Sequence, residues 1–421
     1  MKIAAIICEY NPFHHGHAAL FEGVRARIGE DTAILCILGG NFTQRGTPAL
    51  FSKQARAEMA IRCGADLVLE LPFPHSAASA ERFASSGVHI ANALGCVNVL
   101  AFGSECADTA LLLHLGELLE SDEFREAYRA EPNDSSLGTA AKTEAVFRRV
   151  FGDRRALAAL REPNNLLGVE YIRALIRTHS DILPLALPRV GAAHGDAKAA
   201  TAAIYSATAA RTLLLGDAKT QKKTLSLLPA ASAEVIAREI SCGKIAADDE
   251  LLENLYLMHY RLANEDEMAA YDGLGGGLSS RFHRAAKEAC DGKEMFSLIK
   301  TKKYTDAYLR RALLSGYLGL TRAELNAMPT YTQVLGMNAR GEKILSSIRK
   351  KSGIAILTKP ADYRRLPKDA ALAAERASRA DSLWCALLRQ KGRATDNNRF
   401  SPYREEGGKL SSASSAKALD K

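Results

Sequence analysis

The first 28 residues place an apolar run directly before a turn that is rich in histidine. Residues 3–7 (IAAII) are short, apolar and rich in isoleucine, which is typical of a buried strand in a parallel sheet. Asn11-Pro12 ends this run, and residues 18–27 have helical spacing with an apolar side. The sequence therefore predicts a strand, a turn and a helix, with imidazole side chains where the helix begins.

His14, Gly16 and His17 lie at this predicted helix start. Free backbone N–H groups and the helix dipole favour an anion there, and a glycine lets a phosphate approach the backbone closely. Imidazoles can donate hydrogen bonds to phosphate oxygens as charge develops on them. The pattern favours a phosphate site with His14 and His17 as catalytic residues. The alternatives are a cap or surface role for each histidine and a metal ion shared by both, although no third ligand is evident nearby.

Further apolar runs alternate with helical patterns along the first half of the chain. They are Ala33–Leu38, Asp66–Pro72, Val97–Phe102 and Ile182–Leu187. This alternation predicts an α/β fold with a doubly wound parallel sheet, whose ligands bind beyond the carboxyl ends of the strands. The segments His14–His17, Asn41–Arg45 and Gly103–Glu105 each follow a predicted strand. We therefore expect them to converge on one crevice.

Residues 9–17, EYNPFHHGH, carry the His-x-Gly-His signature of the nucleotidylyltransferase superfamily. The longer string resembles the tRNA(Met) cytidine acetate ligase family, in which asparagine is usual where this chain has His15. Other similar segments are GGNFTQRGTPA, with Gly39 for the usual serine, then SKQAR, GADLVLELP, SAERFASSGV, FGSE, NNLLGVEY and KTKKYT, with Lys303 for arginine. The resemblance runs from Lys2 to about Asn338 and implies a nucleotidylyltransferase-like Rossmann domain followed by a mostly α-helical domain.

The resemblance also implies the reaction of an ATP-dependent ligase. Acetate attacks the α-phosphate of ATP, which gives acetyl-adenylate and pyrophosphate. The wobble cytidine of elongator tRNA(Met) then takes the acetyl group on N4, which gives N4-acetylcytidine and AMP. Mg²⁺ is expected with ATP, bridging its phosphates. The sequence shows no serine–histidine–acid spacing and no persuasive cysteine nucleophile, as expected where the substrate itself attacks ATP.

The residues expected to bind ATP come from four segments of the sequence. They are Ile7, Cys8, Glu9, Tyr10, Asn11, Pro12, Phe13, His14, His15, Gly16, His17, Ala18, Ala19 and Leu20, with Gly103, Asn164 and Arg189. Lys53 is a third catalytic candidate because a lysine adds a point charge to phosphates, the alternative being a surface lysine near a helix start. Asn165 is left open beside Asn164, and both have a turn or N-cap role as the alternative. The alternative for Arg189 is a surface ion pair.

The positive charge of the chain is concentrated in one stretch. Residues 281–368 contain 19 Lys and Arg against 7 Asp and Glu, a net charge of +12, whereas the whole chain carries +8 and the remainder therefore −4. Such a block suggests contact with a polyanion, and Lys300, Lys302, Lys303, Arg310 and Arg311 are the RNA-binding candidates. The alternatives are a solvated basic surface, an enzyme that adenylates a small metabolite, and an RNA-binding protein without catalysis.

Length and composition predict the organisation of the 421 residues. We expect a nucleotide-binding catalytic domain over 1–196, a basic helical domain that binds tRNA over 197–370, and an extension over 371–421 with a disordered tail after Gly407. The eight cysteines are scattered without CxxC spacing, which favours reduced thiols in the cytoplasm. No run of 18 apolar residues predicts a membrane span, and no protein partner is inferred.

Overall fold

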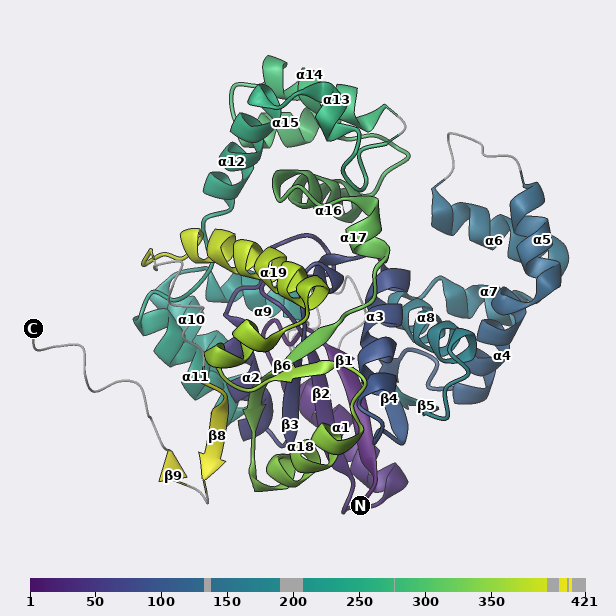
Figure 1. Ribbon diagram of the computed structural model, residues 1–421, viewed down its shortest axis with the longest axis vertical. Helices are drawn as coiled ribbons and strands as arrows, with labels where there is room; N and C mark the ends of the chain where they lie inside the picture. The colour runs from purple at the N-terminus through teal and green to yellow at the C-terminus, as the bar shows by residue number, and fades with distance from the viewer. Residues whose placement is uncertain (132–137, 190–206, 276, 392–400, 407–408, 411–421) are drawn as a thin grey trace, which may run out of the picture.

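One mixed sheet runs through the middle of the molecule, with helices on both faces (Figure 1). The computed structural model describes residues 1–131, 138–189, 207–275, 277–391, 401–406 and 409–410. The strands are β1 (Ile3–Cys8), β2 (Ala33–Gly39), β3 (Leu67–Leu71), β4 (Val99–Ser104), β5 (Leu183–Pro188), β6 (Tyr331–Met337), β7 (Ala355–Leu357), β8 (Tyr403–Glu406) and β9 (Lys409–Leu410).

The sheet has a parallel half and a mixed half. Its order is β5-β4-β1-β2-β3-β6-β8-β9, and β7 pairs with β6 beside this path. The five strands from β5 to β3 are all parallel, which confirms the predicted doubly wound α/β core. Strand β6 then joins β3 in the antiparallel direction, and β7 and β8 run parallel to β6.

Strand β1 shows why its sequence is almost entirely apolar. Ile3, Ala5 and Ile7 pack into the core on one face of the sheet, whereas the residues between them pack into the core on the other face. The first face is covered by α3 (Ala80–Ala93), α8 (Pro163–Arg177) and α18 (Ala339–Lys351), and the second by α1 (His15–Ile28), α2 (Lys53–Arg62) and α11 (Ala230–Ser241). A strand covered on both faces has no polar side, so the sequence reads as a continuous apolar run.

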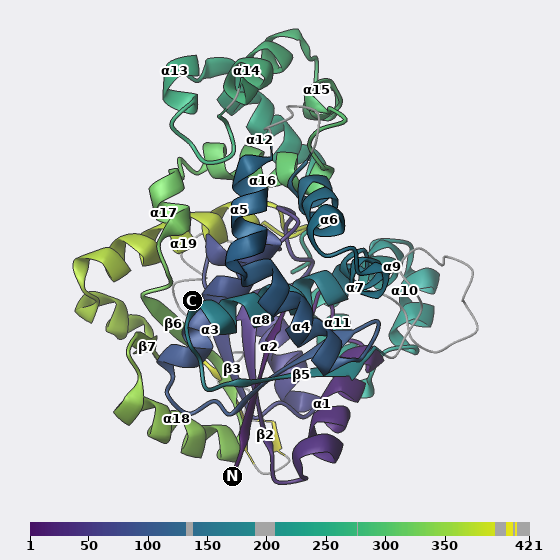
Figure 2. The same cartoon turned by 90° about the vertical axis from the view of Figure 1, so that its right-hand side faces the viewer.

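Two groups of helices stand outside these layers. A side group packs beyond α8 and faces the viewer in Figure 2; it comprises α4 (Thr109–Glu120), α5 (Asp122–Ala130), α6 (Thr139–Val150) and α7 (Arg154–Leu160). A distal helical group lies beyond the carboxyl ends of the parallel strands and comprises α12 (Asp249–Leu262), α13 (Glu265–Met268), α14 (Leu278–Glu288), α15 (Gly292–Ile299), α16 (Asp306–Tyr317) and α17 (Arg322–Asn326). Phe42 and Phe73 from the loops after β2 and β3 join the core of this distal group.

The fold does not follow the domain boundaries predicted at residues 196 and 370. Residues 331–351 supply β6 and α18, which complete the sheet of the first domain, because β6 satisfies the backbone hydrogen-bonding groups at the edge of β3. Beyond residue 370, α19 (Lys368–Ala386) is an integral helix, and its Trp384 indole donates a 2.7 Å hydrogen bond to the Ala49 carbonyl. These long-range contacts join regions that were predicted to be separate domains.

The remaining predicted elements fall partly outside the described residues. The helical region predicted from residue 197 begins, within the described residues, with α9 (Ala207–Leu214), which is followed by α10 (Ala218–Leu225). The tail after Gly407 lies outside the described residues, apart from β9, which pairs with β8. Within the described residues, none of the helices combines the length and apolar character that crossing a membrane requires.

Candidate active site

The first helix begins with a capping box made of two imidazoles. His14 is the N-cap of α1, and its Nδ1 accepts a 3.1 Å hydrogen bond from the Gly16 N–H. His17, in the first turn of the helix, accepts the His14 N–H on its own Nδ1 at 3.2 Å. A capping box usually pairs a hydroxyl residue with Glu or Gln. In this chain the same two histidines that mark the predicted phosphate site also shape its turn.

These capping bonds define the tautomer of both rings. Because each Nδ1 accepts a hydrogen bond, the proton of the neutral ring lies on Nε2. The rings of His14 and His17 stack with their centroids 3.7 Å apart and their planes 22° apart. The turn therefore presents two neighbouring uncharged rings, each with an Nε2–H donor that has no hydrogen-bond partner among the described residues. Such preorganised donors suit phosphate oxygens on which negative charge develops.

Burial keeps both imidazoles neutral. It lowers the pKa of His14 to about 4, with further lowering by the charges of Arg189 and His15. Burial also lowers the pKa of His17 well below its ordinary value, helped by His14 and Arg189. Among the described residues, no group of three His, Cys, Asp or Glu side chains could hold a metal ion, so the structure adds no third ligand to the pair.

The depressed pKa of His14 makes the stability of the fold depend on pH. Between pH 6.5 and about 4, the unfolded chain binds a proton at this residue and the native chain does not, so stability is lost as the pH falls. We expect His14→Asn, which retains a capping side chain, to reduce the slope of unfolding free energy against pH by about 1.4 kcal/mol per unit in this window. His17 and His75 titrate in the same direction and remain, so the slope becomes shallower rather than zero. Urea unfolding of both chains at several pH values measures it, and equal slopes would contradict the assignment.

One buried arginine ties together the segments that follow β1 and β2. Arg56 of α2 is 0% exposed and donates hydrogen bonds to the carbonyls of Glu9 at 2.6 Å, Gly39 at 3.1 Å, Gly40 at 2.7 Å and Phe51 at 3.0 Å. Burial lowers its pKa to about 10, so it remains charged at neutral pH. Sequence reasoning missed this residue, although an arginine between alanines on the buried side of a helix is a usable signal.

Glu9 connects the turn at His14–His17, the imidazole turn, to the segment after β2. Its Oε1 accepts a 2.6 Å hydrogen bond from the Gln44 N–H. Burial raises the pKa of Glu9, whereas the Gln44 N–H and the charge of Arg56 act in the opposite direction. Asn11 makes a second connection, because its Oδ1 accepts the Leu50 N–H at 2.8 Å. The predicted approach of these two segments is therefore present.

The loop after β4 is held by Asn165 at the start of α8. Asn165 is 1% exposed, and its Oδ1 accepts the Ser104 hydroxyl at 2.6 Å and the Glu105 and Cys106 N–H groups at 2.9 and 3.2 Å. Glu105 in return accepts the N–H groups of Asn164 and Asn165, which have no partner within the helix. Asn165 therefore has a positioning role, whereas Asn164 is partly exposed and its Nδ2 donates a hydrogen bond to Glu105.

Arg189 completes this side of the site. Its Nη1 lies 3.8 Å from Glu105 Oε1, its side chain is 32% exposed, and its charge contributes to the lowered pKa of both imidazoles. A Cβ atom at Gly103 would stand 3.1 Å from Arg189 Cγ, so the glycine leaves room for this side chain. The structure thus places Gly103, Asn164 and Arg189 around one loop near the imidazole turn, and their contact with ATP stays a prediction.

Comparison with known proteins identifies the family. The sequence profile of the HIGH Nucleotidyl Transferase family matches residues 1–399. A protein from Acetivibrio thermocellus named tRNA(Met) cytidine acetate ligase is 32% identical over 86% of this chain and 89% of its own length. One of the same name from Caldicellulosiruptor saccharolyticus is 34% identical over 86% and 88%. The chain belongs to the tRNA(Met) cytidine acetate ligase family.

Solved structures from this ligase family share the fold. The crystal structure of Thermotoga maritima TmcAL bound with alpha-thio ATP superposes with a TM-score of 0.86 and 28% identity, covering 96% of this chain and 100% of that one. The apo form of the same protein gives a TM-score of 0.88 with the same coverage. The similarity extends over the distal helical group as well as the sheet.

Lys53 contacts two buried carboxylates of the protein, whereas the sequence predicted a contact with phosphate. The residue is 3% exposed, and its Nζ lies 2.6 Å from Glu70 Oε1 and 2.8 Å from Asp381 Oδ2. Burial alone would lower the pKa of Lys53, but the charges of Asp381 and Glu70 raise it above its usual value. Because two buried carboxylates already compensate its charge, the structure assigns Lys53 to an ion triad between α2, β3 and α19 and corrects the predicted contact with phosphate.

The five residues expected to bind RNA are not equivalent in the structure. Lys302 is exposed and Lys303 partly exposed, whereas Lys300 forms a 2.8 Å ion pair with Asp306. The guanidinium carbon of Arg310 lies 4.3 Å from the centre of the Phe296 ring. Arg311 donates to the Gln44 carbonyl at 2.9 Å, so it holds the loop after β2. Arg311 therefore has a positioning role instead of the predicted RNA contact, and the three lysines and Arg310 remain candidates.

Proposed function

We propose that this protein activates acetate with ATP and transfers the acetyl group to the wobble cytidine of elongator tRNA(Met). Acetate oxygen forms a bond to the α-phosphorus as pyrophosphate leaves, and the N4 amine then displaces AMP from acetyl-adenylate. The neutral imidazole pair of His14 and His17 is the observation that carries this proposal. Its two Nε2–H donors are positioned to stabilise charge on the phosphates without an added proton.

The remaining residues of the site bind and orient ATP in this proposal. Asn164 and Arg189 contact the nucleotide, and Arg can bind phosphate oxygens through two parallel hydrogen bonds. Gly16 and Gly103 allow close approach to the backbone. Mg²⁺ enters with ATP as part of the substrate. The family membership supports ATP and tRNA as substrates, and we place the reaction in the cytoplasm because tRNA is its acceptor.

Acetate-dependent ATP–pyrophosphate exchange tests the first half-reaction. The purified protein is expected to exchange label between pyrophosphate and ATP only with acetate, and to form N4-acetylcytidine when tRNA(Met) is added. Exchange that depends on another small acid would favour adenylation of a different metabolite. A protein that binds tRNA without any exchange would be an RNA-binding relative that lacks catalysis.

The lysines of residues 300–303 provide a test that separates the two half-reactions. We expect a Lys300/Lys302/Lys303 triple alanine variant to retain exchange but to lose most tRNA acetylation at moderate salt, because lysines that contact phosphates position the RNA. The slope of log affinity against log salt should also become shallower, by about 0.7–0.9 for each lost phosphate contact.

A matched control for this variant is available in α10. Lys219, Lys222 and Lys223 are three exposed lysines on that helix, so their triple alanine variant removes the same charge from another surface. Equal loss of tRNA acetylation in both variants would indicate a general effect of net charge. Unchanged acetylation in the first variant would exclude residues 300–303 from the RNA-binding surface.

A further inference from the structure

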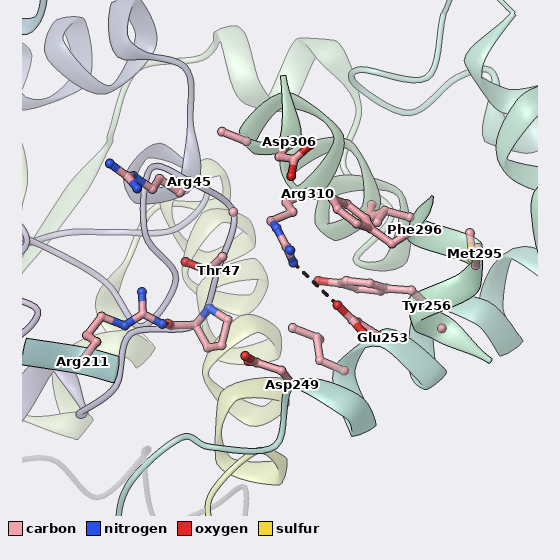
Figure 3. A pocket seen from close by; sticks show the side chains of 16 residues that line it. Arg45, Thr47, Arg211, Asp249, Glu253, Tyr256, Met295, Phe296, Asp306 and Arg310 are labelled. Atoms are coloured by element: carbon pink, nitrogen blue, oxygen red, sulfur yellow. Dashed lines mark hydrogen bonds and ion pairs between the residues drawn. The ribbon is translucent and has the colours of Figure 1, made fainter. Parts of the chain in front are cut away.

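A cavity of about 380 Å³ lies between the loop after β2 and the distal helical group (Figure 3). Residues 45–48 of the loop and Arg211 of α9 form one wall, and α12, α15 and α16 form the other. Its volume falls within the range of about 300–1,000 Å³ that is usual for small-molecule sites. No residue of the imidazole turn, and none of Gly103, Asn164 and Arg189, lines it. The cavity is therefore separate from the candidate ATP site.

The loop side of the cavity is cationic. Arg45 is exposed, and Figure 3 shows Arg45 and Arg211 on the same side of the cavity, opposite the aromatic residues. The Nε of Arg211 is buried and has no hydrogen-bond partner among the described residues. Its only described contact with a carbonyl is a long 3.5 Å hydrogen bond from Nη2 to Pro48. Two guanidinium groups that retain donors without a partner in the described part of the chain suit the phosphate of a ligand.

The helical side of the cavity is aromatic and has its own unpaired polar atom. Tyr256 is 4% exposed, yet its hydroxyl has no hydrogen-bond partner among the described residues. In Figure 3 this hydroxyl is directed from α12 toward the cavity, beside Glu253 and Arg310. Phe296 lies behind Arg310, whose guanidinium covers its ring. Planar groups with a free hydroxyl suit a nucleobase, which stacks on them and offers polar edges.

Backbone hydrogen bonds of Gln44 join the wall of the cavity to the candidate ATP site. The Gln44 N–H donates to Glu9 at the end of β1, and the Gln44 carbonyl accepts from Arg311 of α16. The next turn packs tightly on α16, because a Cβ at Gly46 would stand 2.6 Å from the Arg311 backbone nitrogen. One short loop thus contacts the imidazole turn on one side and forms a wall of the cavity on the other.

We infer that this cavity binds one unpaired nucleotide of the tRNA loop, with its phosphate at Arg45 and Arg211 and its base at Tyr256 and Arg310. The inference rests on the proposed function, since it names a subsite for the same RNA. The occupant is not the cytidine that is acetylated, because that base must reach the imidazole turn. Its capture would instead hold the loop so that the reacting cytidine enters the ATP site.

Two substitutions test the subsite without disturbing the core. Arg45→Ala removes an exposed guanidinium from the loop wall, and Ala307→Trp places a bulky side chain into the cavity from a partly exposed position near the start of α16. Arg349→Ala, at an exposed position of α18 at the opposite end of the sheet, removes the same charge as a control. The probes are an RNA hairpin with the anticodon-arm sequence of elongator tRNA(Met) and the same stem as a duplex without a loop. Thermal unfolding confirms that each variant is folded.

Both variants are expected to weaken hairpin binding about tenfold or more and to leave duplex binding unchanged, and Ala307→Trp should also retain ATP–pyrophosphate exchange. The control should match the unmodified protein throughout. Unchanged hairpin binding in both variants, or equal weakening of hairpin and duplex, would overturn the inference. If the unmodified protein shows neither exchange nor acetylation but the hairpin preference still depends on Arg45 and Ala307, the proposed function fails and the subsite stands.

Discussion

Replacing His17 with alanine is expected to slow acetate-dependent ATP–pyrophosphate exchange by about a hundredfold or more while the chain remains folded. The ring supplies one of two Nε2–H donors at the phosphate site, and loss of one preorganised donor typically lowers the rate by about 10²–10³. The structural loss is one capping hydrogen bond from the His14 N–H, worth about 1 kcal/mol, together with the ring contacts of His17 with His14, Tyr10 and Phe13. Exchange rates and urea unfolding curves of the same preparations measure both effects.

His114→Ala is the matched control for this substitution. His114 is an exposed imidazole on α4, outside the residues that form the site, so its loss should change neither exchange nor stability. A folded His17→Ala variant that exchanges at the rate of the unmodified protein would remove the imidazole from the mechanism. An unfolded variant would show that the structural role of the ring exceeds one hydrogen bond, and His17→Glu, which can still accept the His14 N–H but donates nothing when ionised, then tests the donor.

Replacing Lys53 with methionine is expected to destabilise the fold by about 3–5 kcal/mol, because it leaves two buried carboxylates without their shared cation. Glu70 is 2% exposed and Asp381 8% exposed, so water cannot replace the lost ion pairs. Burial already raises the pKa of Glu70 and the charge of Asp381 raises it further, against the lowering by Lys53. Urea unfolding at neutral pH measures the change in free energy of unfolding.

Lys391→Met tests the same chemistry at the surface. Its Nζ lies 2.6 Å from Asp248, but the two side chains are 54% and 37% exposed, so this pair should contribute less than about 1 kcal/mol. Should Lys53→Met unfold at the same denaturant concentration as the unmodified protein yet lose exchange, the catalytic role first predicted for Lys53 would return. A large loss of stability supports the structural triad instead.

Much of the nucleotide-binding core was predictable because its information is local. The apolar runs at β1, β2 and β3 are long enough to identify buried strands, and the turn at His14 carries a specific motif. The helical spacing of residues 18–27 also located α1. The segments predicted at the carboxyl ends of the strands lie at those ends; they are His14–His17, Asn41–Arg45 and Gly103–Glu105.

Residues that act through distant backbone groups were not predictable in the same way. Arg56 binds four carbonyls from three segments, and none of these partners is visible in the local pattern around it. The choice between Asn164 and Asn165 also needed the structure, since adjacent helix residues point in different directions. Strand β6 was missed as a member of the sheet because its pairing with β3 joins segments far apart in the chain.

The parallel α/β core and the turn at His14–His17 follow from local patterns, because strand and helix periods and the His-x-Gly-His spacing are properties of neighbouring residues. The surroundings of Lys53 depend instead on long-range packing, since its carboxylate partner Asp381 lies 328 positions away. The residues next to a lysine in the sequence do not show whether its ammonium group lies beside phosphates or between two buried carboxylates. Which of them forms depends on where α19 packs, and that contact is set by the burial of whole elements rather than by residues adjacent to the lysine.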